Sequence, residues 1–371
     1  MNNELIHIIP VIRMLASGKN SVLASVIPDI TDNGEELFKK GFTNDPKVIM
    51  ELKSSDIDKT MLLKKFANWF ESHNHPPSFI VIKNLGSIAI RVPSENEKPL
   101  SGKICIVTGA GQGFGAGIAE SLYEKGANIV IADINDRIGS EMNELLKNKG
   151  LTNKSLFIHT DVSDPLSVQE LMHQTALNFG GLDIIISNAE ILYAGGLDEM
   201  TPETFRRMTE VNYYGFFHCT KYASEIMKIQ TDAVPNTFCD IIQINSKSGL
   251  KGSKKNFTYA GSKFGGIGLT QSFAQELMPY RIKVNAICPG NYFEGPLWSD
   301  PDKGLFVQYL KAGKVPGAKT ISDVMNYYES QVPTGRGCQV ADVIKAILYA
   351  IDQNYETGQA IPVTGGQIML H

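Results

Sequence analysis

The stretch Ile-Cys-Ile-Val-Thr-Gly-Ala-Gly-Gln-Gly-Phe-Gly at residues 104–115, together with Asn-Ile-Val-Ile-Ala-Asp at 128–133, decides the fold class. Each stretch contains an apolar run with the length of one buried strand, and the residues between them are enough for one helix. The glycines directly after the first run predict a tight turn in which the backbone can approach a bound phosphate. Residues 104–133 therefore predict the first strand–helix–strand unit of a parallel sheet that binds a dinucleotide.

The same alternation continues toward the carboxyl terminus. Short apolar runs, separated by helical segments, recur at residues 155–161, 182–187, 240–245 and 282–287. Strands that alternate with helices form a parallel sheet covered by helices on both faces. Right-handed crossovers make such a sheet doubly wound, and its ligands bind beyond the carboxyl ends of the strands. We therefore expect an α/β Rossmann fold over residues 99–371.

Residues 1–98 follow a different pattern and are expected to form a smaller α/β region. Segment 93–103 is polar and contains two prolines, which is typical of a linker. Helical spacing of apolar residues in 56–72 predicts a helix capped by one of its first aspartates, and 78–92 predicts two strands joined by a turn. The role of this region is open: an oligomer contact, a regulatory module and an evolutionary remnant all fit its sequence.

The composition excludes several classes of protein. The chain has 371 residues, of which 43% are hydrophobic and 20% charged, as in ordinary globular proteins of about two domains. Its formal net charge of −4 argues against a nucleic-acid or acidic-membrane binder. Five scattered cysteines favour neither a disulfide framework nor a zinc site, so we expect a reducing cytoplasm. Glu4, Pro10 and Arg13 interrupt the first apolar run, which predicts neither a signal peptide nor a membrane span.

Acidic residues at the strand ends indicate the cofactor. Asp133 ends the second strand, where a carboxylate can bind the adenosine ribose hydroxyls and would repel a 2′-phosphate. No Lys or Arg immediately follows it, which favours NAD over NADP. Asp161 and Val162 end the third strand and are expected to lie against the adenine. For Asp161 alone, a cap on the following helix is the alternative.

Tyr259 and Lys263 carry the predicted chemistry. Four residues apart on a helix, they share one face, and the ammonium is expected to lower the pKa of the phenol so that it can accept the proton of an alcohol. Ser246 ends the fifth strand, and its hydroxyl could bond the substrate oxygen. Asn212 lies inside a predicted helix, where asparagine is locally unfavourable, so a role in proton relay is a hypothesis.

Taken in order, these motifs resemble the short-chain dehydrogenase/reductase family over residues 100–371. The resemblance rests on 108–115, Asp161, Asn188-Ala189, Asn212, Ser246, Tyr259, Lys263, Pro289-Gly290 and 357–366. It implies an NAD-dependent alcohol dehydrogenase that works without a metal ion and assembles as a homotetramer. Glu190 departs from the family pattern, because a glycine usually follows the Asn-Ala pair.

The residue pattern and the resemblance together assign expected roles to individual residues. The predicted catalytic residues are Asn212, Ser246, Tyr259 and Lys263. The predicted cofactor-binding residues are Gly109, Gln112, Gly113, Phe114, Gly115, Asp133, Ile134, Asp161, Val162, Asn188, Tyr259, Lys263, Pro289, Gly290 and Tyr292. The predicted substrate-binding residues are Ser246, Lys247, Lys254, Tyr259 and Arg336.

A cluster of lysines points to an anionic substrate. The segment between Ser246 and Tyr259 contains Lys247, Lys251, Lys254 and Lys255. Ammonium groups and loop N–H donors can hold a phosphate, although a solvated basic loop is the alternative. Stretches 241–249, 252–256, 263–272, 332–338 and 357–369 are similar to polyol-phosphate dehydrogenases of the family, which implies oxidation of a phosphorylated polyol by NAD. Residues 291–331 have aromatic residues at helical spacing and are expected to form a lid.

Two other functions remain open at this point. One is a short-chain dehydrogenase/reductase that acts on another polyol or keto substrate. The other is a non-catalytic NAD sensor, in which residues 1–98 bind a partner. The complete set of Ser246, Tyr259, Lys263 and Asn212 speaks against the sensor, because a sensor needs no proton acceptor.

Overall fold

The computed structural model describes residues 2–17, 25–29, 49–83, 85–91 and 98–369. Its larger sheet has seven strands, all parallel, in the order β11-β10-β9-β8-β5-β6-β7. These strands are β5 (Ile104–Thr108), β6 (Asn128–Asp133), β7 (Ser155–His159), β8 (Ile184–Ser187), β9 (Cys239–Ile244), β10 (Ile282–Pro289) and β11 (Ala360–Val363). The predicted runs therefore all became strands. Strands β5, β6, β8, β9 and β10 are buried on both faces of the sheet, whereas β7 lies at its edge and is only half-buried.

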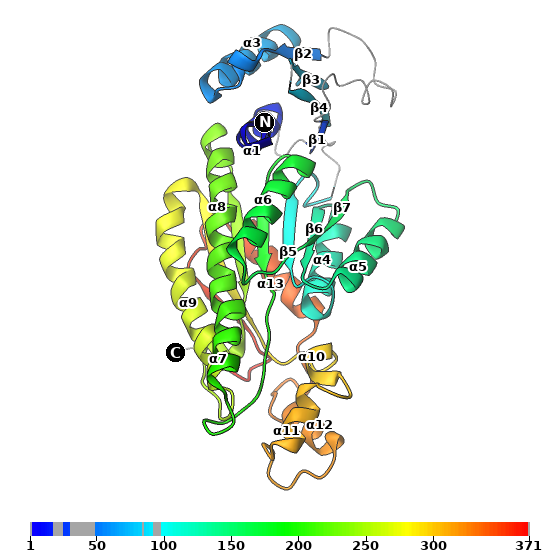
Figure 1. Cartoon of the computed structure of the whole chain (residues 1–371), viewed down its shortest axis with the longest axis vertical. Coiled ribbons are helices and arrows are strands. Elements are labelled where there is room, and N and C mark those ends of the chain that lie inside the picture. The colour runs from blue at the N-terminus through cyan, green and yellow to red at the C-terminus, as the bar shows by residue number, and fades with distance from the viewer. Residues whose placement is uncertain (1, 18–24, 30–48, 84, 92–97, 370–371) are drawn as a thin grey trace.

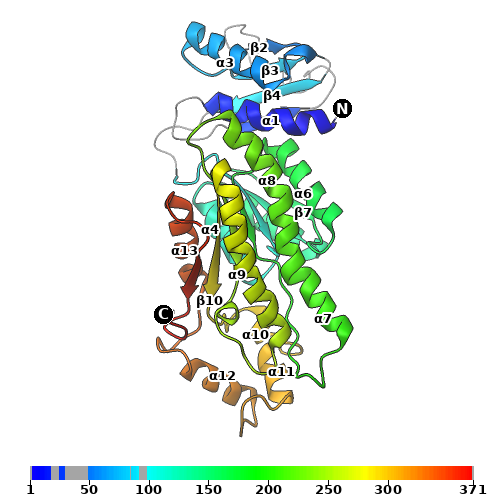
Figure 2. The ribbon, with the colours of Figure 1, turned by 90° about the vertical axis from the view of Figure 1, so that its left-hand side faces the viewer.

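Helices cover both faces of this sheet, as Figures 1 and 2 show. One face carries α6 (Pro165–Phe179), α8 (Gly215–Ala233) and α9 (Phe257–Leu277). The other carries α4 (Gly113–Glu124), α5 (Asp136–Asn148) and α13 (Val340–Asp352). Strand β5 lies between β8 and β6, so the chain winds in opposite directions from it and leaves a crevice at its carboxyl end. The predicted doubly wound Rossmann fold is confirmed.

The connections at the carboxyl ends of the strands build the rim of this crevice. After β8 come α7 (Pro202–Thr209) and a π-helix, η2 (Glu210–Tyr214), which runs directly into α8. Short turns η3 (Lys247–Gly249) and η4 (Met278–Tyr280) flank α9. The predicted lid segment contains α10 (Pro296–Ser299), α11 (Leu305–Lys311) and α12 (Ile321–Ser330). Its aromatic residues form a separate buried cluster, in which Trp298 contacts Phe293, Phe306, Tyr309 and Tyr328.

The amino-terminal region has a sheet of its own, in the order β1-β4-β3-β2. Its elements are β1 (Ser25–Asp29), β2 (Ile49–Leu52), η1 (Ser54–Asp56), α3 (Lys59–His73), β3 (Phe79–Ile82) and β4 (Gly86–Arg91). The predicted helix and the two predicted strands are confirmed. Asp58 caps α3 by accepting hydrogen bonds from the backbone N–H groups of Thr60 and Met61. Residues 92–97, at the expected boundary, lie outside the described residues, so the division at residue 98 stays a prediction.

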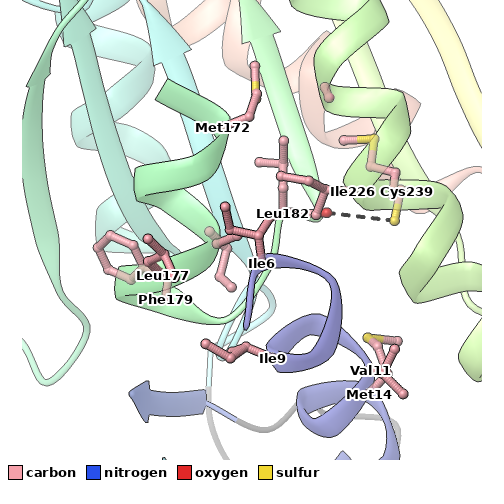
Figure 3. Close-up of a cluster of buried hydrophobic side chains, with 14 of the residues drawn as sticks. Ile6, Ile9, Val11, Met14, Met172, Leu177, Phe179, Leu182, Ile226 and Cys239 are labelled. Atoms are coloured by element: carbon pink, nitrogen blue, oxygen red, sulfur yellow. Dashed lines mark hydrogen bonds between the residues drawn. The ribbon is translucent and has the colours of Figure 1, made fainter. Parts of the chain in front are cut away.

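Helix α1 (Asn2–Ser17) joins the two parts of the molecule. It packs against α3 on one side and against α6 and α8 on the other. Figure 3 shows Ile6 and Ile9 of α1 beside Leu177 and Phe179 of the larger unit. These side chains belong to one continuous buried cluster, so the amino-terminal region shares its core with the Rossmann unit. Within the described ranges, no helix combines the length and apolar content that crossing a membrane requires.

A buried ion pair reinforces this contact. Arg13 of α1 is fully buried, and its Nη2 lies 2.5 Å from Oδ2 of Asp183, which directly precedes β8. The same nitrogen donates a hydrogen bond of 2.8 Å to the carbonyl of Gly102. Asp183 Oδ2 also accepts a 2.7 Å bond from the N–H of Ile104. The pair therefore fastens α1 to the amino ends of the central strands, at the opposite end of the sheet from the crevice (Figure 1).

Candidate active site

A cleft of about 1440 Å³ lies at the carboxyl ends of the central strands, against α10 and α11. It brings together most residues predicted for cofactor and substrate. The predicted residues that line it are Gly109, Gln112, Gly113, Phe114, Asp133, Ile134, Asp161, Val162, Asn188, Ser246, Lys247, Lys254, Tyr259, Pro289, Gly290 and Tyr292. Residues separated by up to half the chain thus meet at one site, because parallel strands end at the same edge of the sheet.

The glycine-rich turn forms a cradle at the start of α4. Gly109 and Gly113 have φ angles of +63° and +61°, which other residues adopt only with strain. A Cβ on Gly115 would lie 2.1 Å from the carbonyl oxygen of Gly109, so only glycine allows the turn to close. Gly115 therefore shapes the loop from below and does not line the cleft. The N-terminus of α4 opens beside this turn, where its N–H groups fit the phosphates of a dinucleotide.

Asp133 lies at the end of β6 beside the same turn. Its Oδ2 accepts a 2.8 Å hydrogen bond from the N–H of Gly111, and its Oδ1 accepts a 3.0 Å bond from the N–H of Asn135. Each oxygen keeps a second lone pair, so the carboxylate can still accept bonds from ribose hydroxyls. Arg137 also lines this end of the cleft, where it pairs with Glu141 at 2.9 Å.

Asp161 lines the cleft, as expected for a residue at the end of the third predicted strand. Its Oδ1 accepts hydrogen bonds of 2.9 Å from the N–H of Ser163 and 2.6 Å from the hydroxyl of Ser163. Helix α6 is capped by Asp164, whose side chain accepts a bond from the N–H of Leu166. The alternative that Asp161 caps this helix is therefore wrong, because the helix begins at Pro165 and Asp164 is its cap.

Tyr259 and Lys263 lie on α9. Tyr259 lines the cleft, whereas Lys263 is buried beside it and does not line the cleft itself. Tyr259 is 5% exposed and Lys263 is 2% exposed. Lys263 Nζ donates a 2.9 Å hydrogen bond to the carbonyl of Ile244, at the end of β9. The phenol of Tyr259 donates a 2.9 Å hydrogen bond to Oε2 of Glu190, and Lys263 Nζ lies 2.6 Å from the same oxygen. Helix α9 thus presents the two groups as predicted, with a carboxylate between them.

This carboxylate changes the expected electrostatics of the pair. Burial and the negative charge of Glu190 hold the pKa of Tyr259 well above its ordinary value, although the nearby Ser246 side chain acts in the opposite direction. The expected lowering of the phenol pKa by Lys263 is therefore not seen in the free protein. The physical reasons are the burial of the phenol, which is the larger effect, and the negative charge of Glu190 beside it.

Asn212 lies in the π-helix η2, close to the loop that carries Glu190. Its Oδ1 accepts a 2.9 Å hydrogen bond from the N–H of Ile191, and its Nδ2 donates a 2.8 Å bond to the carbonyl of the same residue. These two bonds satisfy the amide side chain that looked out of place in a helix. They hold the loop after β8 against the helical segment, while the proposed proton-relay role stays a prediction.

Asn188, directly after β8, also holds a neighbouring loop through its side-chain amide. Its Nδ2 donates hydrogen bonds to the carbonyls of Thr108 (2.9 Å) and Gly109 (3.2 Å). It therefore ties the glycine-rich turn to the neighbouring strand and lines the cleft at the same time.

Arg336 is not brought to this cleft. It lines a neighbouring cavity of about 400 Å³. Its guanidinium pairs with Asp342, with N–O distances of 2.7 and 3.0 Å. Because that carboxylate already occupies the guanidinium, the structure offers no support for its predicted contact with substrate.

Lys314 is a cleft residue that the sequence analysis did not single out. It lies between α11 and α12, and its Nζ is 3.9 Å from the centre of the Tyr309 ring. Burial and repulsion from Lys247 lower the pKa of Lys314 to about 8. Burial, with a smaller effect of Lys251, lowers the pKa of Lys247 to about 8 as well. The signal that could have found Lys314 is its position beside the aromatic helical pattern of the lid.

The chain is similar to dehydrogenases of known family. The family model described as short chain dehydrogenase matches residues 103–297. Sorbitol-6-phosphate 2-dehydrogenase of Escherichia coli K12 is 34% identical over 271 residues, which are 72% of this chain and 99% of that protein. An uncharacterized oxidoreductase of Thermotoga maritima is 33% identical over 267 residues, which are 71% of this chain and 97% of that protein.

A solved structure agrees with these relatives. The crystal structure of sorbitol-6-phosphate 2-dehydrogenase SrlD from Erwinia amylovora matches with a TM-score of 0.66 and 34% identity. The match covers 72% of this chain and 100% of that chain.

The fold and the cleft together define an oxidoreductase with a nicotinamide cofactor. The cradle of glycines, the open lone pairs of Asp133 and the helix N-terminus fit such a dinucleotide. The chain belongs to the short-chain dehydrogenase family. The described residues contain no group of three or more His, Cys, Asp or Glu side chains placed to hold a metal ion.

Proposed function

We propose that this protein oxidises D-sorbitol 6-phosphate to D-fructose 6-phosphate, with NAD as the hydride acceptor. The observation that carries the proposal is the pair Lys247 and Lys314, which line the cleft that also contains Tyr259. Among the described residues, no carboxylate forms an ion pair with either ammonium. Burial lowers the pKa of both groups, and the charge of Lys247 lowers the pKa of Lys314 further. Two partly buried cations without a carboxylate are best satisfied by a bound anion.

The phosphate of a polyol phosphate fits this requirement. Bonds between ammonium groups and phosphate oxygens are charge-assisted and short. Lys247 directly follows Ser246, so a phosphate held there keeps the rest of the substrate within the cleft. Lys254 also lines the cleft and stays a candidate contact. The Escherichia coli relative, whose name specifies sorbitol 6-phosphate, supports the choice of substrate.

The residues at the floor of the cleft support an alcohol oxidation. Ser246 Oγ accepts a 3.1 Å bond from the N–H of Ser248, which leaves its own proton to donate to the substrate oxygen. Tyr259, once deprotonated, accepts the hydroxyl proton of the substrate. The carbon–hydrogen bond then breaks with its electron pair, the carbonyl double bond forms, and Tyr259 later releases the proton to solvent. The nicotinamide cofactor supplies the acceptor for the hydride.

Residues on this chain indicate how the cofactor would be held. We propose that Gly109, Gln112 and Gly113 bind its phosphates, Asp133 its adenosine ribose, and Lys263 its nicotinamide ribose. The carboxylate of Asp133 favours NAD. Arg137 lines the same end of the cleft and could favour a 2′-phosphate, but its pairing with Glu141 weakens that alternative.

We also propose that the protein forms a homotetramer in the cytoplasm. Helices α8 and α9 lie side by side on the surface in Figure 2. They expose Phe217 (41%) and Phe264 (48%), which are large apolar side chains that an interface between copies would cover.

The test of this function is a comparison of substrates and cofactors. We expect reduction of NAD with sorbitol 6-phosphate, slower turnover with unphosphorylated sorbitol, and lower kcat/KM with NADP. We expect Tyr259→Phe to abolish turnover because it removes the proton acceptor. Equal turnover of sorbitol with and without phosphate would contradict the proposal.

Substitution of the two lysines tests the phosphate contact directly. Lys247→Ala and Lys314→Ala should each raise KM for sorbitol 6-phosphate about tenfold, which corresponds to about 1.4 kcal/mol. Neither should change KM for sorbitol. Since both ammonium groups lose their proton near a pKa of about 8, KM for the phosphorylated substrate should rise above that pH. Lys255→Ala is the matched control, because Lys255 already pairs with Glu199 at 3.0 Å.

A further inference from the structure

Glu190 occupies a position that short-chain dehydrogenases usually give to glycine. It follows β8 and lines the cleft, with a side chain that is 24% exposed. Oε2 of its carboxylate contacts both catalytic side chains, at 2.9 Å from the phenol oxygen of Tyr259 and 2.6 Å from Nζ of Lys263. The residue therefore belongs to the candidate reaction site.

The contacts of Glu190 are specific to this pair. Within the described part of the chain, its side chain takes part in the hydrogen bond to Tyr259 and the ion pair with Lys263. A carboxylate that only stabilised its loop would accept bonds from nearby backbone N–H groups instead. The loop itself is held by Asn212, through the backbone of Ile191. The Glu190 side chain is thus available for a task other than folding.

The chemistry of the pair shows what that task is. Oxidation of an alcohol needs Tyr259 as phenolate and Lys263 open toward the nicotinamide ribose. A carboxylate at hydrogen-bond distance keeps the proton on the phenol and engages the ammonium. In the protein without its cofactor, Glu190 therefore keeps Tyr259 protonated and keeps Lys263 in an ion pair.

We propose that Glu190 is a positioning residue that holds Tyr259 and Lys263 in the free enzyme and competes with the cofactor for Lys263. The proposal rests on the proposed function of this pair. It predicts that the protein has a built-in competitor at the nicotinamide end of the cleft, which the usual glycine would not provide.

The groups around the phenol limit the causes of any pH effect. Glu190 approaches it from the loop after β8, and Lys263 lies on α9, with Nζ 5.4 Å from the centre of the Tyr259 ring. Ser246 approaches from the end of β9, and Tyr309 from α11. Glu190 is the carboxylate among these groups. Removing its negative charge should therefore lower the pKa of the Tyr259 phenol.

The first test measures cofactor binding without turnover. Glu190→Gln and Glu190→Gly should bind NADH at least about threefold more tightly than the wild type, measured by calorimetric titration of the full-length protein. NADH is the suitable probe because its nicotinamide ring is neutral, so loss of the carboxylate charge does not act on the ring itself. The glycine variant restores the usual family residue, which guards against a folding defect.

The second test measures the pH dependence of alcohol oxidation. The rise of kcat/KM with pH should shift by about one unit toward lower pH in Glu190→Gln, because loss of the nearby anion favours the phenolate. Asp198→Asn is the matched control, since Asp198 is exposed further along the same loop. It removes the same charge and should leave both NADH affinity and the pH profile as in the wild type.

The two proposals fail in different ways. If the wild type oxidises no polyol or polyol phosphate, the proposed function is wrong, while the NADH titration still tests Glu190. If the wild type is active but both Glu190 variants keep its NADH affinity and pH profile, the role given to Glu190 is wrong and the proposed function stands.

Discussion

The proposed preference for NAD rests on one carboxylate, that of Asp133. It is 7% exposed and accepts hydrogen bonds from two backbone N–H groups, that of Gly111 in the glycine-rich turn and that of Asn135 in its own turn. Asp133→Ala should lower the ratio of kcat/KM for NAD to that for NADP at least about tenfold, because it removes a charge-assisted bond to the ribose and leaves Arg137 in place. Steady-state rates with both cofactors measure the ratio.

A neighbouring carboxylate provides the control for this prediction. Asp136 begins α5 and pairs with His159 at 2.8 Å. Asp136→Asn should leave the cofactor ratio unchanged. An unchanged ratio in Asp133→Ala as well would remove the argument that Asp133 binds the ribose.

At this scale the sequence predicted which residues meet but not how they pair. Tyr259 and Lys263 share a helix, so their proximity follows from the helical repeat. Glu190 lies 69 residues away from Tyr259, and nothing in the local pattern says that its side chain bonds the phenol. The sequence likewise showed no sign that Arg336 pairs with Asp342, because that contact depends on how the turn before α13 folds. Arg336 was therefore expected to contact the substrate.

Among the elements, the π-helix η2 links the helical face to the loop after β8. Asn212→Ala would leave the N–H and carbonyl of Ile191 without these partners, which should cost about 1–3 kcal/mol of unfolding free energy. Because the loop also carries Glu190 and Asn188, kcat should fall in the same variant. Urea denaturation and steady-state rates measure the two effects.

The control for this variant lies one turn earlier in the same helical segment. Thr209 donates a hydrogen bond of 2.9 Å to the carbonyl of Phe205, within the helix. Thr209→Ala should therefore leave kcat unchanged. A normal kcat in Asn212→Ala would show that the loop does not depend on this contact.

The elements of the larger sheet were predictable because their strands are short apolar runs separated by turn signals. The ends of the helices between them were harder to predict. Helix α6 is capped by Asp164 and not by Asp161, because local hydrogen bonds determine where a helix begins. Helix α1 was not predicted at all. Its side chains are apolar on nearly all sides, which suits a helix buried between two units but gives no amphipathic signal.

At the scale of the whole molecule, two ion pairs among the described residues connect the amino-terminal region to the Rossmann unit. Arg13 and Asp183 are both fully buried, whereas Lys59 and Asp232 are 39% and 68% exposed. Arg13→Met should lower the free energy of unfolding by about 3–5 kcal/mol, because it leaves a buried carboxylate without its cation. Lys59→Met should cost less than about 1 kcal/mol.

Urea denaturation of both variants measures this difference. The same small effect in Arg13→Met and Lys59→Met would contradict the prediction. It would show that the buried ion pair, and with it α1, contributes less to the stability of the Rossmann unit than its burial indicates.

The amino-terminal region is fastened to the strand ends farthest from the cleft, and this has a practical consequence. The exposed Lys64 of α3 lies on that remote end, so a surface or carrier protein coupled there would leave the entrance of the cleft unobstructed. Immobilisation through this lysine should preserve the turnover rate, whereas attachment on α10 or α11, which border the cleft, should lower it.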